Sequence, residues 1–125
     1  MNTYRTHYCS DLSIQNLDQD VVLSGWIDTM RDHGNLLFID LRDNYGITQC
    51  VVDSSNPNFE QINALNHETV IKITGKVLKR SSDTINTSLK TGEIEIVIKA
   101  FEILSKSFDK IMLRAIQNTI QAFKI

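Results

Sequence analysis

The sequence predicts a mainly β fold, a small five-stranded barrel with one helix between its third and fourth strands. Two observations support this class. Five segments rich in β-branched residues alternate apolar and polar side chains, which is the pattern of a half-buried strand. Turn-forming residues separate these segments, and 125 residues of which 42% are hydrophobic suffice for one modest core. We therefore expect a single barrel domain.

The first three strands are expected to be consecutive neighbours. Residues 21–27 form the first, and Gly25 interrupts their alternation, as expected where a strand bends around a small barrel. Residues 36–43 form the second strand, and turn-forming residues at 43–46 lead into the third strand, residues 47–53. The second and third strands therefore form an antiparallel hairpin.

The next part of the chain adds a helix and two strands. Turn and capping residues at 54–58 precede apolar residues at helical spacing, which predicts a short helix over about residues 59–66. Residues 70–79 alternate as a fourth strand, a hydroxyl-rich loop covers 80–88, and residues 93–103 form the fifth strand. This order of elements is that of the OB-fold, a Greek-key barrel that binds oligonucleotides.

The barrel domain is expected to occupy residues 1–105, and residues 106–125 form a C-terminal helical extension or a truncated linker. A stripe at helical spacing predicts the helix, and it consists of Met112, Ile116, Ile120 and Phe123. Three interpretations of this helix stay open. It covers one end of the barrel, mediates self-association, or is an unnatural end produced by truncation or a shifted reading frame.

Charge and composition exclude several classes of function. A formal net charge of −2 argues against a generic nucleic-acid coat, because non-specific binding to phosphates needs an excess of Lys and Arg. Cys9 and Cys50 lie far apart without a CxxC pair or a His cluster, so no metal site and no disulfide framework is predicted. No window approaches a membrane span. We expect a cytoplasmic protein with no membrane partner, and any nucleic-acid site must be local and selective.

The second strand places one aromatic side chain outside the barrel. Phe38 shares a face with Asp40 and Arg42, opposite the aliphatic side chains of Leu37, Ile39 and Leu41. An exposed ring stacks on an unpaired base and contributes about 1–3 kcal/mol per base with little discrimination. The alternative is that the inner and outer faces of this strand are assigned the wrong way round, and that Phe38 belongs to the core.

Side chains on the neighbouring strands supply the directional groups. Gln49, Arg80 and Glu95 are expected to offer hydrogen bonds to base edges, which is how single-stranded RNA is read. The alternative is that Arg80 and Glu95 form a solvated surface pair. These types of side chain beside an exposed aromatic favour a site for single-stranded nucleic acid.

Short motifs follow one another in a specific order over residues 5–104. They are Arg5-Thr6-His7-Tyr8-Cys9, Gly25-Trp26-Ile27, Arg31-Asp32-His33-Gly34, Phe38-Ile39-Asp40-Leu41-Arg42-Asp43, Gly46-Ile47-Thr48-Gln49, Thr74-Gly75-Lys76-Val77 and Thr91-Gly92-Glu93-Ile94-Glu95. In this order and spacing they resemble the N-terminal anticodon-binding OB-fold domain of bacterial aspartyl-tRNA synthetases. The third and last motifs separate the chain from the related lysine and asparagine synthetases.

The resemblance implies a role for each candidate residue. In that family the domain splays out an anticodon whose first base is guanine or a modified guanine, followed by uracil and cytosine. Phe38 resembles the aromatic that stacks on the central uracil, and Gln49 the amide that bonds its edge. Glu95 resembles the carboxylate that accepts from the guanine's ring nitrogen and amino group. Arg31 and Arg80 are similar to arginines near the anticodon bases and phosphates.

Two further positions follow from the resemblance. Asn86 lies in the loop that approaches the anticodon. His33 resembles the variant of the family that charges asparagine tRNA as well as aspartate tRNA, although it is as readily explained by a hydrogen bond within its turn. The family carries basic residues where this chain has Asp28-Thr29-Met30-Arg31, so phosphate affinity would rest mainly on Arg31 and depend less on salt.

A complete synthetase of this family continues into a class II catalytic domain that uses ATP and Mg²⁺, and it forms a homodimer largely outside this region. We expect no catalytic residue, metal or cofactor in these 125 residues, because Asp40, Asp43 and His33 lack a nucleophile or metal partner. Acidic residues at strand ends are commonly solvated turn residues. The competing function is a free-standing OB-fold module for single-stranded DNA or RNA, which would need a basic groove and several aromatics.

Overall fold

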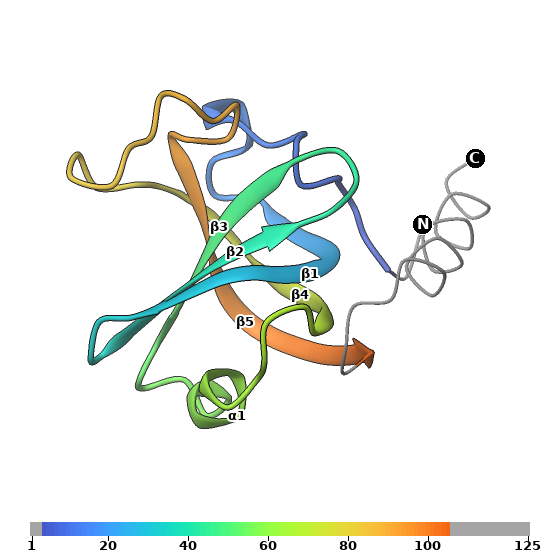
Figure 1. Cartoon of the computed structure of the whole chain (residues 1–125). Helices are drawn as coiled ribbons and strands as arrows, with labels where there is room; N and C mark the ends of the chain where they lie inside the picture. Colours follow the sequence, from blue (N-terminus) through green and yellow to red (C-terminus); the bar gives the residue numbers. More distant parts are fainter. Residues whose placement is uncertain (1–3, 106–125) are drawn as a thin grey trace.

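Five strands close into a barrel in the computed structural model, which describes residues 4–105 (Figure 1). The helix α1 (Phe59–Asn63) lies between the third and fourth strands and sits at one end of the barrel. Neighbouring strands pair in the order β1-β2-β3-β5-β4, and β4 pairs back to β1. The strands are β1 (Asp20–Asp32), β2 (Leu36–Arg42), β3 (Ile47–Asp53), β4 (Val70–Lys79) and β5 (Ile94–Ser105). The mainly β class and the position of the helix are confirmed.

The strand β1 is longer than the sequence predicted because it serves two neighbours. It pairs with β4 as far as Trp26 and with β2 from Trp26 onward. At this crossing Gly25 packs against β2 so closely that a Cβ atom would lie 2.2 Å from the carbonyl oxygen of Arg42. A bulge follows Ile27 and increases the bend. The prediction ended this strand at Ile27, because residues 28–32 are mostly polar and show no alternation.

Apolar side chains from all five strands and α1 fill the barrel. On β2 the burial alternates as predicted, so Phe38 is half-buried on the outer face. The parity assigned to this strand is therefore confirmed, and Phe38 is not part of the buried cluster. The largest fully buried side chains include Leu23, Ile27, Leu37, Ile39, Leu41, Ile73, Ile94 and Ile96.

The other predicted boundaries differ from the structure by a few residues. The helix α1 ends at Asn63 rather than near residue 66, and β5 extends to Ser105. Residues 106–125, with the predicted helical stripe, lie outside the described residues. Within residues 4–105, no helix is long and apolar enough to cross a membrane.

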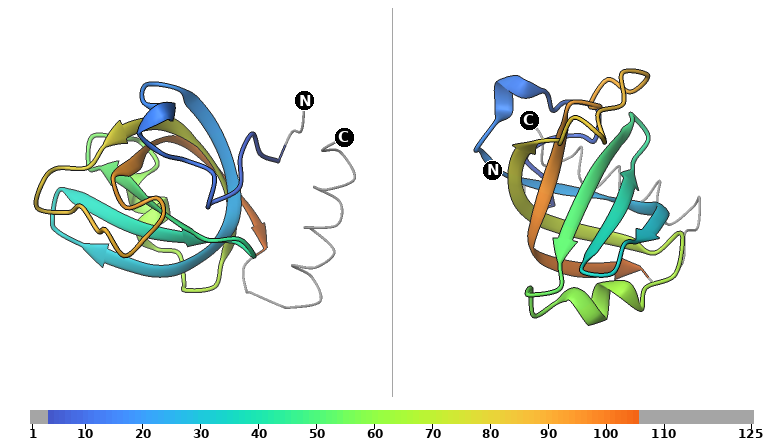
Figure 2. Two further views of the ribbon diagram at one scale, coloured as in Figure 1. Left: turned by 90° about the horizontal axis from the view of Figure 1, so that it is seen from above. Right: turned by 90° about the vertical axis from the view of Figure 1, so that its left-hand side faces the viewer.

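Two segments project on the same side of the barrel, as seen from above (Figure 2, left). One is the turn between β1 and β2, at residues 33–35, and the other is the loop between β4 and β5, at residues 80–93. Between them lies the outer face of β2, β3 and β5. This arrangement brings side chains from distant parts of the sequence to one surface.

Candidate nucleic-acid interface

Two adjoining cavities lie between the β1–β2 hairpin and the β4–β5 loop. The larger measures about 600 Å³ and the smaller about 330 Å³, and Leu36, Phe38 and Thr84 line both. All seven residues that the sequence selected line one cavity or the other. The larger is lined by Arg31, His33, Phe38, Gln49, Arg80 and Asn86, and the smaller by Phe38 and Glu95.

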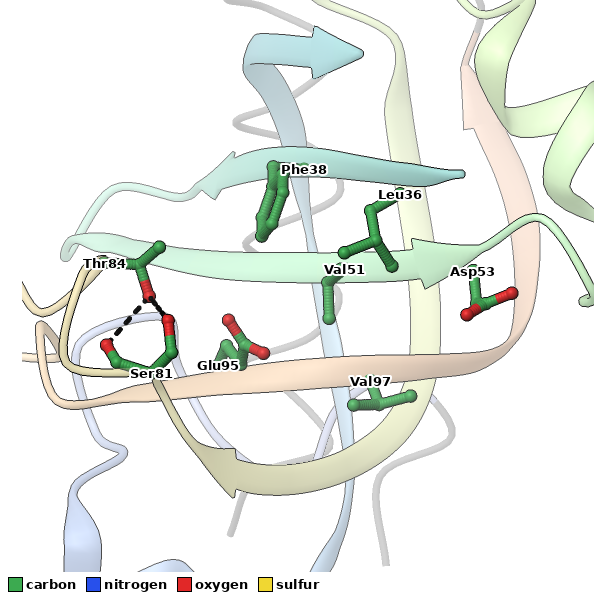
Figure 3. A pocket seen from close by; sticks show the side chains of 8 residues that line it. All are labelled: Leu36, Phe38, Val51, Asp53, Ser81, Thr84, Glu95 and Val97. Carbon is green, nitrogen blue, oxygen red and sulfur yellow. Dashed lines mark hydrogen bonds between the residues drawn. The ribbon is translucent and has the colours of Figure 1, made fainter. Parts of the chain in front are cut away.

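The ring of Phe38 lies between the two cavities. In Figure 3 it extends from β2 over the same outer face as Val51 of β3 and Glu95 of β5. The imidazole of His33 meets its edge, with ring centroids 5.3 Å apart and planes at 85°. The bond within the turn comes from the backbone of His33, whose N–H donates to Leu36 O at 2.9 Å. The structure therefore directs the His33 side chain to Phe38 rather than into its own turn.

A hydrogen-bonded network covers the floor of the larger cavity. Arg31 donates through Nη1 to Asp40 Oδ2 at 2.8 Å and through Nη2 to Asp40 Oδ1 at 3.3 Å. The same Nη2 donates to Gln49 Oε1 at 3.1 Å, and Gln49 Nε2 donates to Glu95 Oε1 at 3.0 Å. Thr29 donates its hydroxyl to Asp40 Oδ2 at 2.6 Å. Arg31, Gln49 and Glu95 are thus joined in one chain of hydrogen bonds, and Asp40 holds the Arg31 end of that chain.

The pKa of Asp40 lies below its ordinary value. Burial raises its pKa, but hydrogen bonds from Arg31 and Thr29 and the positive charges of Arg31 and Arg80 outweigh that effect and lower the pKa below its ordinary value. Its side chain is 21% exposed. The carboxylate therefore balances two guanidinium groups beneath the cavity.

Arg80 points inward from the end of β4. It is 5% exposed, and it donates through Nε to Ile94 O at 2.8 Å and through Nη1 to Thr84 O at 2.9 Å. Its Nη2 is buried and has no hydrogen-bond partner within residues 4–105. Burial lowers the pKa of Arg80 below its ordinary value, and the negative charges of Asp40 and Glu95 offset only part of that effect. The alternative that Arg80 and Glu95 form a solvated surface pair is therefore wrong, because Arg80 is buried and its hydrogen bonds go to backbone carbonyls.

The β4–β5 loop supplies the upper wall of the larger cavity. Asn86 is exposed there, and its Oδ1 accepts from the N–H and the hydroxyl of Ser88 at 3.1 and 2.6 Å. The sequence did not select Thr84 or Leu89, which also line this cavity. Nothing in the sequence pattern distinguishes either from the other polar and apolar residues of the loop.

Asp40 and Asp43 are not solvated turn residues, which corrects the expectation from the sequence. Asp43 is 4% exposed and accepts from three backbone N–H groups, those of Cys9 and Tyr45 at 2.8 Å and Gly46 at 3.0 Å. A buried carboxylate needs such partners, so Asp43 pins the β2–β3 turn to the N-terminal segment. In the described part of the chain, no group of three or more His, Cys, Asp or Glu residues is arranged to hold a metal ion.

Comparison with known proteins agrees with this geometry. A family model described as an OB-fold nucleic acid binding domain, for the tRNA anticodon, matches residues 21–104. The chain is 62% identical over 104 residues to an aspartate–tRNA(Asp/Asn) ligase of Pelagibacter ubique, covering 83% of this chain and 18% of that protein. It is 52% identical over 105 residues to the enzyme of the same name from Paramagnetospirillum magneticum, covering 84% and 12%.

Solved structures show the same fold. An asparaginyl-tRNA synthetase of Pyrococcus horikoshii matches with a TM-score of 0.69 and 23% identity, over 86% of this chain and 24% of that one. An aspartyl-tRNA synthetase of Entamoeba histolytica matches with a TM-score of 0.70 and 20% identity, over 81% and 21%.

The chain spans less than a fifth of the length of these curated relatives. The region that matches is a nucleic acid binding domain, so the expectation that the catalytic domain lies outside these 125 residues is confirmed. The barrel topology, the cavities beside Phe38 and the family match lead to one assignment. The chain belongs to the tRNA anticodon family of OB-fold nucleic acid binding domains.

Proposed function

We propose that this domain binds the anticodon loop of aspartate tRNA as part of an aspartate–tRNA ligase. The observation that carries the proposal is the larger cavity, which is lined by the half-buried ring of Phe38 and by Arg80, whose buried Nη2 has no hydrogen-bond partner within residues 4–105. An unpaired donor in a buried position favours a ligand with an acceptor oxygen or nitrogen. Bases and phosphates both carry such acceptors.

Each candidate residue is assigned one part of the anticodon in this proposal. Phe38 stacks on the central uracil. Gln49 forms hydrogen bonds to the edge of that base with the second hydrogen of its Nε2 and the second lone pair of its Oε1, which the bonds to Glu95 and Arg31 do not use. Glu95 uses its second carboxylate oxygen to accept from guanine, the first base. Arg80 donates to a base or phosphate, and Asn86 approaches the anticodon from the loop.

We propose that the domain accepts asparagine tRNA as well. The relatives are named as ligases for both aspartate and asparagine tRNAs, and the genetic code makes the two anticodons differ only in their third base. A site for both must tolerate cytosine or uracil there. His33, which lies against the edge of Phe38, is our candidate for the residue that permits this tolerance.

The chemistry of the ligase belongs to other parts of the parent protein. We propose that ATP and Mg²⁺ bind there, that the parent is a homodimer through surfaces outside this domain, and that it works in the cytoplasm. The supporting observation is that the chain spans only 18% of the Pelagibacter relative and matches its binding domain. The role of this domain is then to select the tRNA.

Binding titrations test the proposal. The 125-residue chain is titrated with an RNA hairpin that carries the anticodon guanine-uracil-cytosine and with one whose first base is adenine. We expect clearly weaker binding of the adenine hairpin, because adenine has no donor pair that matches the carboxylate of Glu95. A third hairpin, with uracil as third base, should bind comparably to the first if asparagine tRNA is also accepted.

Equal affinity for the guanine and adenine hairpins contradicts selective reading of the first base. That result favours a free-standing single-strand module, which holds bases by stacking and tolerates any sequence. A homopolymeric single-stranded DNA of the same length distinguishes the two further, since only the generic module should bind it as well as the hairpins.

A further inference from the structure

One row of polar side chains crosses four adjacent strands beneath the larger cavity. Thr29 of β1 stands opposite Asp40 of β2, and Asp40 stands opposite Gln49 of β3. Gln49 and Glu95 each lie one residue before the paired residues Cys50 and Ile96 of β3 and β5. Their side chains share the outer face because strands alternate. Arg31, two residues after Thr29, reaches back into the row.

The orientation of the Gln49 amide decides what it offers to a base. Its oxygen only accepts and its nitrogen only donates, so a flipped amide presents the wrong group at each position. In the structure the oxygen faces Arg31 Nη2 at 3.1 Å and the nitrogen faces Glu95 Oε1 at 3.0 Å. Arginine has donors alone and a carboxylate has acceptors alone. These two neighbours therefore fix the amide in one orientation.

Arg31 orients Gln49 only if its own guanidinium is held. Its side chain is 41% exposed, and a long side chain in that position loses conformational entropy when it is fixed. Asp40 supplies the restraint, because it accepts from both Nη1 and Nη2 of Arg31 in a two-point contact. Thr29 restrains Asp40 in turn with a hydroxyl donated at 2.6 Å.

We propose that Asp40 is a positioning residue for base recognition, which acts through Arg31 to set the Gln49 amide for the central base of the anticodon. This inference rests on the proposed function. Asp40 itself contacts no base in this scheme. The primary task of Arg31 is then to orient Gln49 rather than to bind phosphate, which revises the role implied by the family resemblance.

Arg31→Lys separates the two roles of Arg31. Lysine keeps the positive charge for phosphate but lacks the planar fork that bridges Asp40 and Gln49. We expect the variant to keep its affinity for a hairpin with cytosine as central base, because the phosphate contribution remains. It should bind the guanine-uracil-cytosine hairpin about tenfold more weakly, as expected for the loss of one hydrogen bond, so its preference for central uracil falls by the same factor. Asp40→Asn should lower the preference similarly.

Arg42→Lys is the matched control. Arg42 also lies on the outer face of the sheet, is 40% exposed and pairs with an aspartate, Asp28, at 3.3 Å, but it does not line either cavity. Its replacement should leave the preference for central uracil unchanged. Equal losses in Arg31→Lys and Arg42→Lys would point to a general effect of replacing an arginine on this face and overturn the positioning role.

A double-mutant cycle tests whether Asp40 acts through Gln49. In a Gln49→Ala background, Asp40→Asn should cause no further loss of the preference for central uracil. In a Phe38→Ala background the loss should persist, because stacking is a separate contribution. A full additional loss in the Gln49→Ala background contradicts the proposal.

The side-chain amide of Gln49 gives a readout that needs no RNA. In a ¹⁵N–¹H correlation spectrum of the free chain, Asp40→Asn and Arg31→Lys should shift the Gln49 NH₂ pair and speed its exchange with water, while Arg42→Lys should not. An unchanged Gln49 signal in a folded Asp40→Asn protein overturns the positioning role. If the amide responds but the wild-type chain cannot tell the hairpins apart, the positioning holds and the proposed function fails.

Discussion

Phe38 is the residue whose removal should weaken binding without changing selectivity. Its ring stands on the outer face of β2 and lines both cavities. We expect Phe38→Ala to weaken binding of the guanine and adenine hairpins alike, by roughly 1–3 kcal/mol, the contribution of one stacked base. Tyr45→Ala is the control, because it removes a 48% exposed aromatic that packs on Tyr8 away from the cavities. Fluorescence titration measures both, and unchanged binding in Phe38→Ala contradicts the stacking role.

Glu95 should contribute selectivity rather than affinity. Glu95→Gln keeps an oxygen that can accept from Gln49 Nε2, but it removes the charge offered to guanine. We expect the preference for guanine over adenine at the first base to fall by roughly tenfold, in line with a hydrogen bond to a charged group. Competition titration with the two hairpins measures this ratio. A fall in affinity for both hairpins at a constant ratio would indicate a merely structural role.

The pKa of Asp40 makes its contribution to stability dependent on pH. Because the pKa is lowered in the folded chain, the ionised carboxylate adds stability that is fully present above its unfolded value of about 3.9. This stability disappears as pH falls through the folded pKa. Asp40→Asn should therefore lower the free energy of unfolding at pH 7, by about 1 kcal/mol for a partly exposed ion pair.

Urea denaturation of both proteins between pH 3 and 7 measures the difference. It should be constant above about pH 5 and shrink below about pH 4. Asp20 and Asp53 also have lowered pKa values, but both proteins keep them, so their effects cancel. A difference that stays constant down to pH 3 would show that the charge of Asp40 is not what stabilises the fold.

The candidate residues were predictable from the sequence, but their partners were not. Phe38 followed from alternation on a strand, which depends only on local order. The inward turn of Arg80 depends on the carbonyls of Ile94 and Thr84, which lie in distant or irregular segments. Asp40 appeared to be an ordinary strand-end carboxylate, because its partner Arg31 belongs to a stretch of β1 that shows no strand pattern.

At the scale of the elements, the point where β1 changes its pairing from β4 to β2 depends on Gly25. A Cβ atom there would lie 2.2 Å from Arg42 O and 2.9 Å from Arg42 C, which is backbone that cannot move aside cheaply. We expect Gly25→Ala to lower the free energy of unfolding by at least about 2 kcal/mol, as overpacking does in a tight core. Urea denaturation measures this value.

Gly34→Ala is the matched control for Gly25→Ala. Gly34 has a φ of 78°, but nothing lies within 4 Å of a Cβ added there. Its replacement should cost about 1–2 kcal/mol from backbone strain alone. If both variants lose the same small amount, close packing at the β1 crossing is not what requires Gly25.

The elements with a regular pattern were predicted well, and those defined by tertiary contacts were not. The strands β2, β3 and β4 were predicted to within one residue, because apolar and polar side chains alternate along them. The second half of β1 is held by backbone pairing with β2 and ends in polar residues, so no local sequence pattern indicates that it is a strand. The predicted helix extended past Asn63 because Leu65 continues the spacing, although its backbone already leaves the helix.

For the whole molecule, charge is balanced within the site rather than concentrated on it. The chain carries a net charge of −2, and the larger cavity combines Arg31 and Arg80 with Asp40, while Glu95 lies beside it. A generic single-strand binder would show an excess of positive charge along its groove. Local neutralisation favours hydrogen bonds and stacking over phosphate attraction as the source of affinity.

Salt dependence tests this balance. Each phosphate contacted on a single strand contributes about −0.7 to the slope of log K against log salt concentration. With Arg31 committed to Asp40 at 2.8 Å, we expect a slope for the anticodon hairpin between about −0.7 and −2. Asp40→Asn releases the charge of Arg31 and should steepen the slope by about 0.7, one phosphate. Titrations across a range of salt concentrations measure both, and a wild-type slope beyond about −4 would require a broad phosphate-binding surface.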